Sequence, residues 1–194
     1  MPDRPRIRGP WNDWLADPLS RDHLVHFYKD PSSLADAVAI FAGAGLAKGE
    51  AVVLVTTREN GAAVRRALRE DGVEIEDLER WGQLRVLDAD DRLDELLLEG
   101  MPDPDQFRVL SSALIADARK ASRNGRVRMC GEMVNLLWRR GQQEAAFRLE
   151  ELWTDVVLSY AIPMLCFYGV EDGAAAPQSL CDAHTHVVPV EACA

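Results

Sequence analysis

The sequence contains no long apolar run and no concentrated basic stretch, and both absences exclude classes of protein. No segment approaches the roughly 18 consecutive apolar residues that a membrane span requires, so we expect membrane contact only through a partner. The 194 residues carry a formal net charge of −10 without any run of lysine and arginine. Binding DNA or RNA needs a basic face that neutralises phosphates, so nucleic acid is not an expected partner.

Cysteine is scarce and irregularly spaced. The four cysteines, Cys130, Cys166, Cys181 and Cys193, form neither a closely spaced disulfide pattern nor a Cys-x-x-Cys pair. Residues 1–14 are polar and contain prolines, and they lack the apolar core of a signal peptide. We therefore expect a reducing, cytoplasmic location.

A glycine-rich phosphate-binding loop is also missing. A nucleotide enzyme of the topology expected below would place glycines, a lysine and a serine or threonine after its first strand, where they hold the phosphates. Residues 29–33 read Lys-Asp-Pro-Ser-Ser, which adds a carboxylate and removes one amide donor. Because no Gly-x-Ser-x-Gly nucleophile motif occurs either, the sequence predicts no enzyme and no cofactor.

The composition is that of one folded domain. A hydrophobic fraction of 47% with 28% charged residues leaves enough aliphatic material for a buried sheet. Residues 1–21 contain four prolines and read as a poorly structured arm, residues 22–190 as a single domain, and residues 191–194 as a tail. Trp11 and Trp14 would pin the arm to its own domain or, less favoured, to the second subunit of a homodimer.

Short apolar runs alternate with amphipathic segments from residue 22 onwards. This alternation is typical of a parallel sheet with helices on both faces. We expect a three-layer α-β-α architecture with a mostly parallel sheet of about five core strands. The expected strands are 24–28, 52–55, 84–87, 127–130 and 164–168, with a further edge strand at 187–188.

Helices are expected between these strands. Apolar residues at three- and four-residue steps predict a helix over 34–44, and Ser33 with Asp36 forms a capping-box pattern at its start. The other expected helices cover 64–68, 107–118 and 180–183, with a helical pair broken at Gly141 and ended by Pro163.

Several polar side chains end the predicted strands. Ligands of open parallel sheets bind at the carboxyl ends of the strands, so these residues are expected to line one crevice. They include His26 and Tyr28 after the first strand, Thr56 and Thr57 after the second, Asp88 and Asp90 after the third, Cys130 and Glu132 after the fourth, and Tyr168 after the fifth. Glu132 could instead be a first-turn acid that the following helix dipole stabilises, and the sequence leaves both readings open.

Cysteine and histidine residues suggest two further kinds of site, a reactive thiol and a metal site. Cys130 and Cys166 lie in apolar strands, where a free cysteine is more often a small buried side chain than a reactive thiol. Their sulfurs could still face one pocket if the two strands are neighbours. Cys181, His184 and His186 are candidate metal ligands, but three ligands without a second cysteine pair favour no metal there.

Seven segments occur in an order and spacing that resemble one known family. They are His26-Phe27-Tyr28, Gly45 to Glu50, Gly82-Gln83-Leu84, Gly131-Glu132-Met133, Leu149 to Trp153, Leu165 to Tyr168 and Cys181 to Pro189. The chain resembles the MEDS family, the sensory domain of methanogens, methylotrophs and dichloromethane-type regulators, over about residues 22–190. The family's pattern has an aromatic residue in place of Cys130 and an asparagine in place of Thr154.

The resemblance implies a RecA-like, KaiC-related core without ATPase machinery. It also implies sensing of small molecules such as simple hydrocarbon derivatives, often in fusion with histidine kinase or DNA-binding modules. The pocket residues that it implies are His26, Tyr28, Glu132, Cys166 and His184, while Glu150 and Trp153 would be structural.

Residues and resemblance together predict a sensory domain. It would bind a small, mostly apolar ligand at the carboxyl edge of its sheet and signal through a partner such as a histidine kinase or a transcriptional regulator. The expected ligand-binding residues are His26, Tyr28, Cys130, Glu132, Cys166, Tyr168 and His184. One alternative is a ligand-free interaction module that docks through its acidic surface and arm. A less favoured alternative is an enzyme that uses Glu132 and His26 as acid and base.

Overall fold

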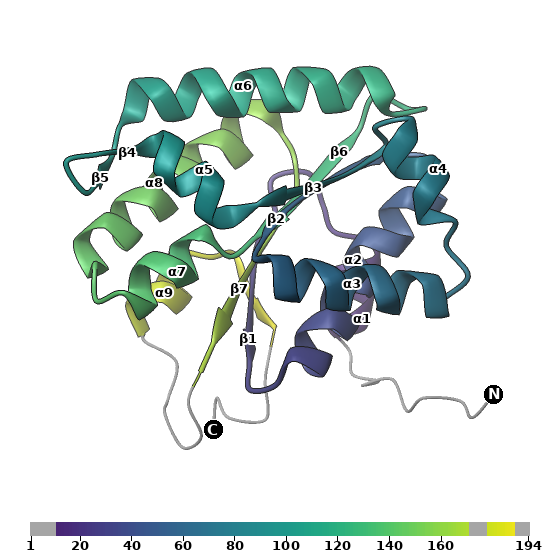
Figure 1. Ribbon diagram of the computed structural model, residues 1–194, viewed down its shortest axis with the longest axis horizontal. Coiled ribbons are helices and arrows are strands. Elements are labelled where there is room, and N and C mark those ends of the chain that lie inside the picture. The colour runs from purple at the N-terminus through teal and green to yellow at the C-terminus, as the bar shows by residue number, and fades with distance from the viewer. Residues whose placement is uncertain (1–10, 171–177, 189–194) are drawn as a thin grey trace.

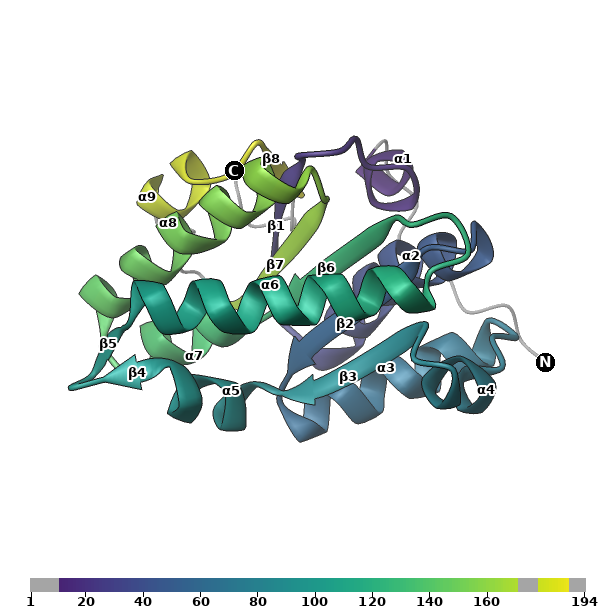
Figure 2. The same cartoon turned by 90° about the horizontal axis from the view of Figure 1, so that it is seen from above.

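A six-stranded parallel sheet forms the centre of the computed structural model, which describes residues 11–170 and 178–188. The strand order is β3-β2-β6-β7-β1-β8, so β3 and β8 are the opposite edges (Figure 2). The strands are β1 (His23–Tyr28), β2 (Ala51–Thr56), β3 (Leu84–Asp88), β6 (Val127–Gly131), β7 (Met164–Gly169) and β8 (His186–Val188). Every residue of β1, β2 and β6 is buried, as expected for strands covered on both faces.

Helices cover both faces of the sheet (Figure 1). One apolar cluster joins the sheet to α1 (Trp11–Ala16), α2 (Pro31–Ala47), α3 (Arg58–Glu70) and α4 (Ile75–Arg80). A second joins the other face to α5 (Ala89–Leu96), α6 (Pro104–Ala121), α7 (Met133–Arg139), α8 (Gln143–Tyr160) and α9 (Gln178–Asp182). A short antiparallel pair, β4 (Leu97–Leu98) and β5 (Met101–Pro102), follows α5. Among the helices described, none is long and apolar enough to cross a membrane.

The three-layer prediction is confirmed, and all five expected core strands are present within one or two residues of their predicted ends. The sixth strand, β8, pairs with β1 where the sequence indicated an edge strand. Sequence patterns did not predict α4, α5 or the β4–β5 pair. These elements are short, and α5 and α4 each contain too few apolar residues to show a clear helical period.

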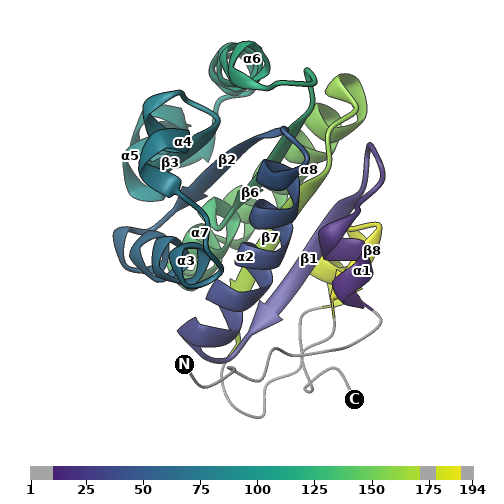
Figure 3. The same ribbon diagram turned by 90° about the vertical axis from the view of Figure 1, so that its right-hand side faces the viewer.

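Helix α1 lies inside the segment that the sequence indicated to be poorly structured. Trp11 and Leu15, one helical turn apart, are both buried against the α2 side of the sheet. Figure 3 shows α1 beside β1 and β8, where the ring of Trp14 lies 4.9 Å from that of His186. The arm therefore packs on its own domain over 11–16, while residues 1–10 and the expected tail 191–194 lie outside the described part.

The predicted capping box of α2 is wrong. The helix begins three residues earlier, at Pro31, with Asp30 as its N-cap. The Asp30 carboxylate accepts hydrogen bonds from the backbone N–H groups of Ser32 at 3.0 Å and Ser33 at 2.9 Å. Aspartate at the cap and proline at the first helical position are both favourable, and together they outweigh the Ser33–Asp36 pattern.

A buried ion pair ties α1 and α2 to the sheet. The Arg128 guanidinium, in β6, donates through Nε to Glu50 and through Nη1 to the carbonyl oxygens of Leu15, Ala16 and Phe41 at 3.1–3.2 Å. Arg128 is fully buried, and a side chain at Gly45 would put its Cβ 2.7 Å from Arg128 Cδ and Nε. The segment from Gly45 to Glu50 thus makes room for Arg128 and supplies its counter-charge.

Candidate functional site

Glu132 follows β6 at the carboxyl edge of the sheet and is 2% exposed. Its Oε1 accepts hydrogen bonds from Thr56 Oγ1 at 2.5 Å, from the Thr57 backbone N–H at 2.7 Å and from Thr57 Oγ1 at 3.1 Å. Asn60 Nδ2 lies 2.9–3.0 Å from both carboxylate oxygens. Glu132 makes no capping hydrogen bond to α7, so its side chain fastens β6 to β2 and α3 instead.

Tyr28 reaches this network through Asn60. The Tyr28 hydroxyl lies 3.5 Å from Asn60 Nδ2, and burial together with the nearby Glu132 charge raises the pKa of Tyr28. His26, two residues earlier on the same face of β1, is buried and stacks on Trp11 with ring centroids 6.5 Å apart. The sequence analysis missed Asn60, although its place in the first turn after β2 is a signal that could have found it.

The sheet separates the seven expected ligand-binding residues into two groups. Cys130 packs with Tyr28 on the α2 side, whereas Cys166 and Tyr168 belong to the cluster on the α8 side. Cys130 pairs with Leu165 in the neighbouring strand and Cys166 with Gly131, so the two cysteine side chains leave the sheet on opposite faces. Burial raises the pKa of Cys130 to about 12 and that of Cys166 well above its usual value.

A second polar cluster lies between the sheet and α8. It consists of His23 from β1, Glu150 from α8, Cys166 from β7 and His184 from the segment after α9, and their nitrogen, oxygen and sulfur atoms lie within 4.8 Å of one another. His23 Nε2 is 3.3 Å from Cys166 Sγ and 3.5 Å from Glu150 Oε2. His184 Nε2 is 3.5 Å from Glu150 Oε1. These residue types are those that bind transition metals.

Burial sets the protonation of this cluster. It lowers the pKa of His23 to about 4, helped by His184 and opposed by Glu150. Burial acts to raise the pKa of Glu150, but His184, His23 and the hydrogen bond from the Tyr168 hydroxyl hold it below its usual value. At neutral pH, His23 is therefore neutral, Glu150 is ionised and the Cys166 thiol keeps its proton.

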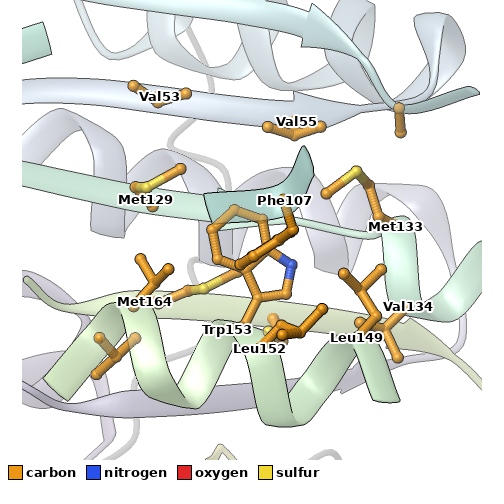
Figure 4. Packing of buried hydrophobic residues seen from close by; sticks show 14 of the residues in the cluster. Val53, Val55, Phe107, Met129, Met133, Val134, Leu149, Leu152, Trp153 and Met164 are labelled. Atoms are coloured by element: carbon orange, nitrogen blue, oxygen red, sulfur yellow. The ribbon is translucent and has the colours of Figure 1, made fainter. Parts of the chain in front are cut away.

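An apolar hollow opens beside the carboxyl ends of β2 and β3. Its volume is about 70 Å³. Its apolar walls are Val55, Leu87, Leu96, Phe107, Leu110, Leu114, Met133 and Trp153, and its polar members are Arg92 and Ser111. Figure 4 shows Phe107 against the indole of Trp153, and their ring centroids are 4.8 Å apart in an edge-to-face arrangement.

A second, smaller inner cavity shares lining residues with this hollow. Val55, Met133 and Trp153 line both, and Cys130 and Cys166 line the inner cavity as well. Cys166 therefore borders both the cavity and the polar cluster. None of the seven expected ligand-binding residues lines the outer hollow. The sequence analysis missed its walls because they come largely from helix faces, which read as ordinary core.

The three metal ligands considered from the sequence do not gather in the structure. Only His184 belongs to the cluster that could hold a metal, among the residues described. The His186 ring packs on Trp14, and Cys181 is partly buried against the α8-side core. His23 and Glu150 were missed as candidate metal ligands because 161 positions separate His23 from His184 in the sequence.

Comparison with known proteins gives one finding. The family model described as MEDS, MEthanogen/methylotroph, DcmR Sensory domain, matches residues 22–185. A search of curated proteins found no match. The matched range covers every strand of the main sheet except β8, together with both polar clusters.

Proposed function

We propose that this chain, which belongs to the MEDS family of sensory domains, binds a small, mostly apolar molecule in the hollow beside Phe107 and Trp153. The observation that carries the proposal is the hollow itself, which is apolar, open at one end and formed by four helices and two strands. Ligand sites are typically concave and mostly apolar, with a few polar groups that orient the ligand. A volume of about 70 Å³ limits the ligand to a molecule of few atoms.

Arg92 supplies the polar group at this hollow. Its Nη2 is 2.7 Å from Glu95, while its Nε is buried and has no hydrogen-bond partner among the residues described. A buried N–H without a partner is costly, and a ligand oxygen could satisfy it. The favoured ligand is therefore an apolar molecule that carries one hydrogen-bond acceptor.

The turn after β1 supports a ligand other than a nucleoside triphosphate. The Asp30 carboxylate already accepts the first free N–H groups of α2, and its negative charge would repel a phosphate placed there. Glu132 also suits a structural role better than that of a general base, because donors from Thr56, Thr57 and Asn60 engage it. We therefore propose a binding protein and not an ATPase or other enzyme.

Signalling would follow from the position of the hollow. A ligand seated there touches α5, α6, α7 and α8 together, so it favours whichever packing of these helices fits it best. A partner protein such as a histidine kinase or a transcriptional regulator would read that shift in population.

Thermal unfolding with a panel of halogenated one- and two-carbon hydrocarbons, short alcohols and small esters tests the proposal. A ligand at about 100 times its Kd stabilises the folded chain by about 2.7 kcal/mol. Leu110→Trp should fill the hollow and abolish the response, whereas Val109→Trp, at an exposed neighbouring position on α6, should retain it. No response of the wild-type chain to any panel member, or an equal response of Leu110→Trp, would refute this site.

A further inference from the structure

We infer that His23, Glu150, Cys166 and His184 form a binding site for one Zn²⁺ ion. The four side chains come from four separate segments of the chain, and each is at most 2% exposed. This inference does not depend on the ligand proposed for the apolar hollow.

The distances between the ligand atoms match those between the corners of a tetrahedron with zinc at its centre. Zinc bonds of about 2.0–2.1 Å to nitrogen or oxygen and about 2.3 Å to sulfur place neighbouring ligand atoms roughly 3.3–3.6 Å apart. His23 Nε2 is 3.3 Å from Cys166 Sγ, and each histidine Nε2 is 3.5 Å from a Glu150 oxygen. Cys166 Sγ lies 3.9 Å from Glu150 Oε2. Only small side-chain shifts would bring all four atoms to one ion.

Both histidines turn Nε2 towards the centre of the cluster, and each has a hydrogen-bond partner for Nδ1. His184 Nδ1 lies 2.6 Å from the Leu180 carbonyl oxygen, which can only accept, so Nδ1 carries the proton. Thr154 Oγ1 donates to the Glu150 carbonyl at 3.0 Å, which leaves it to accept from His23 Nδ1 at 3.3 Å. Partners of this kind orient metal-binding histidines.

His184 provides a second observation. Its side chain is 0% exposed, and its buried Nε2 faces Glu150 Oε1 at 3.5 Å without a hydrogen bond of good geometry. A buried acceptor of this kind is unfavourable unless something binds it. A cation between His184 and Glu150 would satisfy this lone pair.

The charges balance when zinc binds. Two neutral imidazoles, the Glu150 carboxylate and a Cys166 thiolate carry −2 together, which one divalent cation neutralises. The Cys166 proton leaves as the sulfur–zinc bond forms, as for other thiol ligands. Two imidazoles, a thiolate and a carboxylate in a tetrahedron favour zinc over magnesium or calcium, which prefer oxygen ligands.

The site would anchor the segment after α9. Thr185 already bonds to the backbone of His23, with its N–H 2.7 Å from the His23 carbonyl oxygen. Zinc held by His184, Glu150 and the two strand residues would fix this segment to β1, β7 and α8. With four protein ligands and no open position, its role is structural.

Metal analysis of the full-length chain without a polyhistidine tag tests the inference. Protein produced with added zinc and dialysed without chelator should retain about one Zn²⁺ per chain, as a closed four-ligand site does. His184→Gln should lower this to under about one tenth. His186→Gln, two residues away and outside the cluster, should keep the full amount.

Cobalt substitution covers the case in which His184→Gln fails to fold. Co²⁺ added to chelator-treated wild-type chain should give the absorption band of a thiolate–cobalt bond. Cys166→Ser should lose this band and Cys181→Ser should keep it. The inference is overturned if folded wild-type chain takes up no Zn²⁺ in calorimetry, if His184→Gln binds as much as His186→Gln, or if the cobalt complex lacks a thiolate band.

Discussion

At the scale of single residues, Glu132 stabilises the junction of β2, β6 and α3. Glu132→Ala leaves the donors of Thr56, Thr57 and Asn60 without their acceptor in a buried place. Unpaired buried donors cost about 1–3 kcal/mol. Urea unfolding should show a loss of about that size.

Glu151→Ala is the matched control for Glu132→Ala. Glu151 pairs with Arg148 on the surface, and both side chains are largely in solvent. Exposed pairs of this kind contribute about 0–1 kcal/mol. Equal unfolding free energies for Glu132→Ala and Glu151→Ala would show that the hydrogen bonds to Glu132 stabilise the fold no more than an exposed ion pair does.

Alanine substitutions at two glycines of α2, Gly45 and Gly43, should change the free energy of unfolding in opposite directions. Gly45→Ala forces its Cβ to 2.7 Å from Arg128 Cδ and Nε, and overpacking of this kind costs about 1–3 kcal/mol. Gly43→Ala meets only Leu68 Cδ2 at 3.5 Å, an ordinary contact, and should gain up to about 1 kcal/mol because alanine is the better helix former.

Thermal and urea unfolding of the two glycine variants measure this difference. Our description of the Arg128 environment is wrong if Gly45→Ala is as stable as Gly43→Ala. Gly45→Ala and Gly43→Ala are a matched pair because both positions lie in α2, two residues apart.

At the scale of elements, the start of α2 depends on Asp30. Asp30→Ala removes the acceptor for Ser32 N–H and Ser33 N–H, and loss of an N-cap costs about 1 kcal/mol. Asp30→Asn keeps a capping oxygen and should lose much less at neutral pH. Chemical unfolding of both variants measures the two costs, and a larger loss for Asp30→Asn would contradict the capping role.

The Asp30 carboxylate also makes the free energy of unfolding depend on pH, and the direction of its pKa shift sets the direction of that dependence. The hydrogen bonds from Ser32 and then from Ser33 lower the pKa of Asp30 below its ordinary value of 3.8. The unfolded state therefore binds the proton first, so this contribution is fully present above pH 3.8 and disappears as the pH falls through the lower folded-state pKa. The stability difference between wild type and Asp30→Asn should shrink below that pH, and a difference that grows there would have the wrong sign.

Sequence patterns predicted those elements whose signal is local. The five core strands are short, mostly apolar runs, and runs of this kind predict buried strands from local sequence alone. The start of α2 was misplaced because two capping patterns overlap within four residues, and only the better cap, Asp30, is used. Helix α5 went unpredicted because three of its eight residues are aspartates, although it provides Arg92 and Leu96 to the hollow.

At the scale of the whole molecule, the order of the strands in the sheet decides which residues meet at the two candidate sites. Local sequence patterns do not predict this order. Strand-end residues such as Tyr28 and Glu132 meet as expected because the carboxyl ends of parallel strands share an edge. Cys130 and Cys166 illustrate the limit, since neighbouring strands brought them close while the register sent their side chains to opposite faces. His23 and His184 come together through the pairing of β1 with β8, whose partner residues are 162 positions apart.

The order of the strands also connects the two candidate sites. Cys166 lines the inner cavity and also contributes to the His23–Glu150–Cys166–His184 cluster, and that cavity shares Val55, Met133 and Trp153 with the apolar hollow.

Native mass spectrometry of freshly purified chain tests the central claim, that the hollow beside Phe107 and Trp153 holds a small molecule, most directly. Spectra of wild type and of Val109→Trp should show an added small organic mass that Leu110→Trp lacks, because only Leu110 lines the hollow. The panel member that stabilises the wild-type chain should restore this added mass after it has been stripped. The account is contradicted if Leu110→Trp carries the same organic mass as wild type, or if wild type never takes up any panel member.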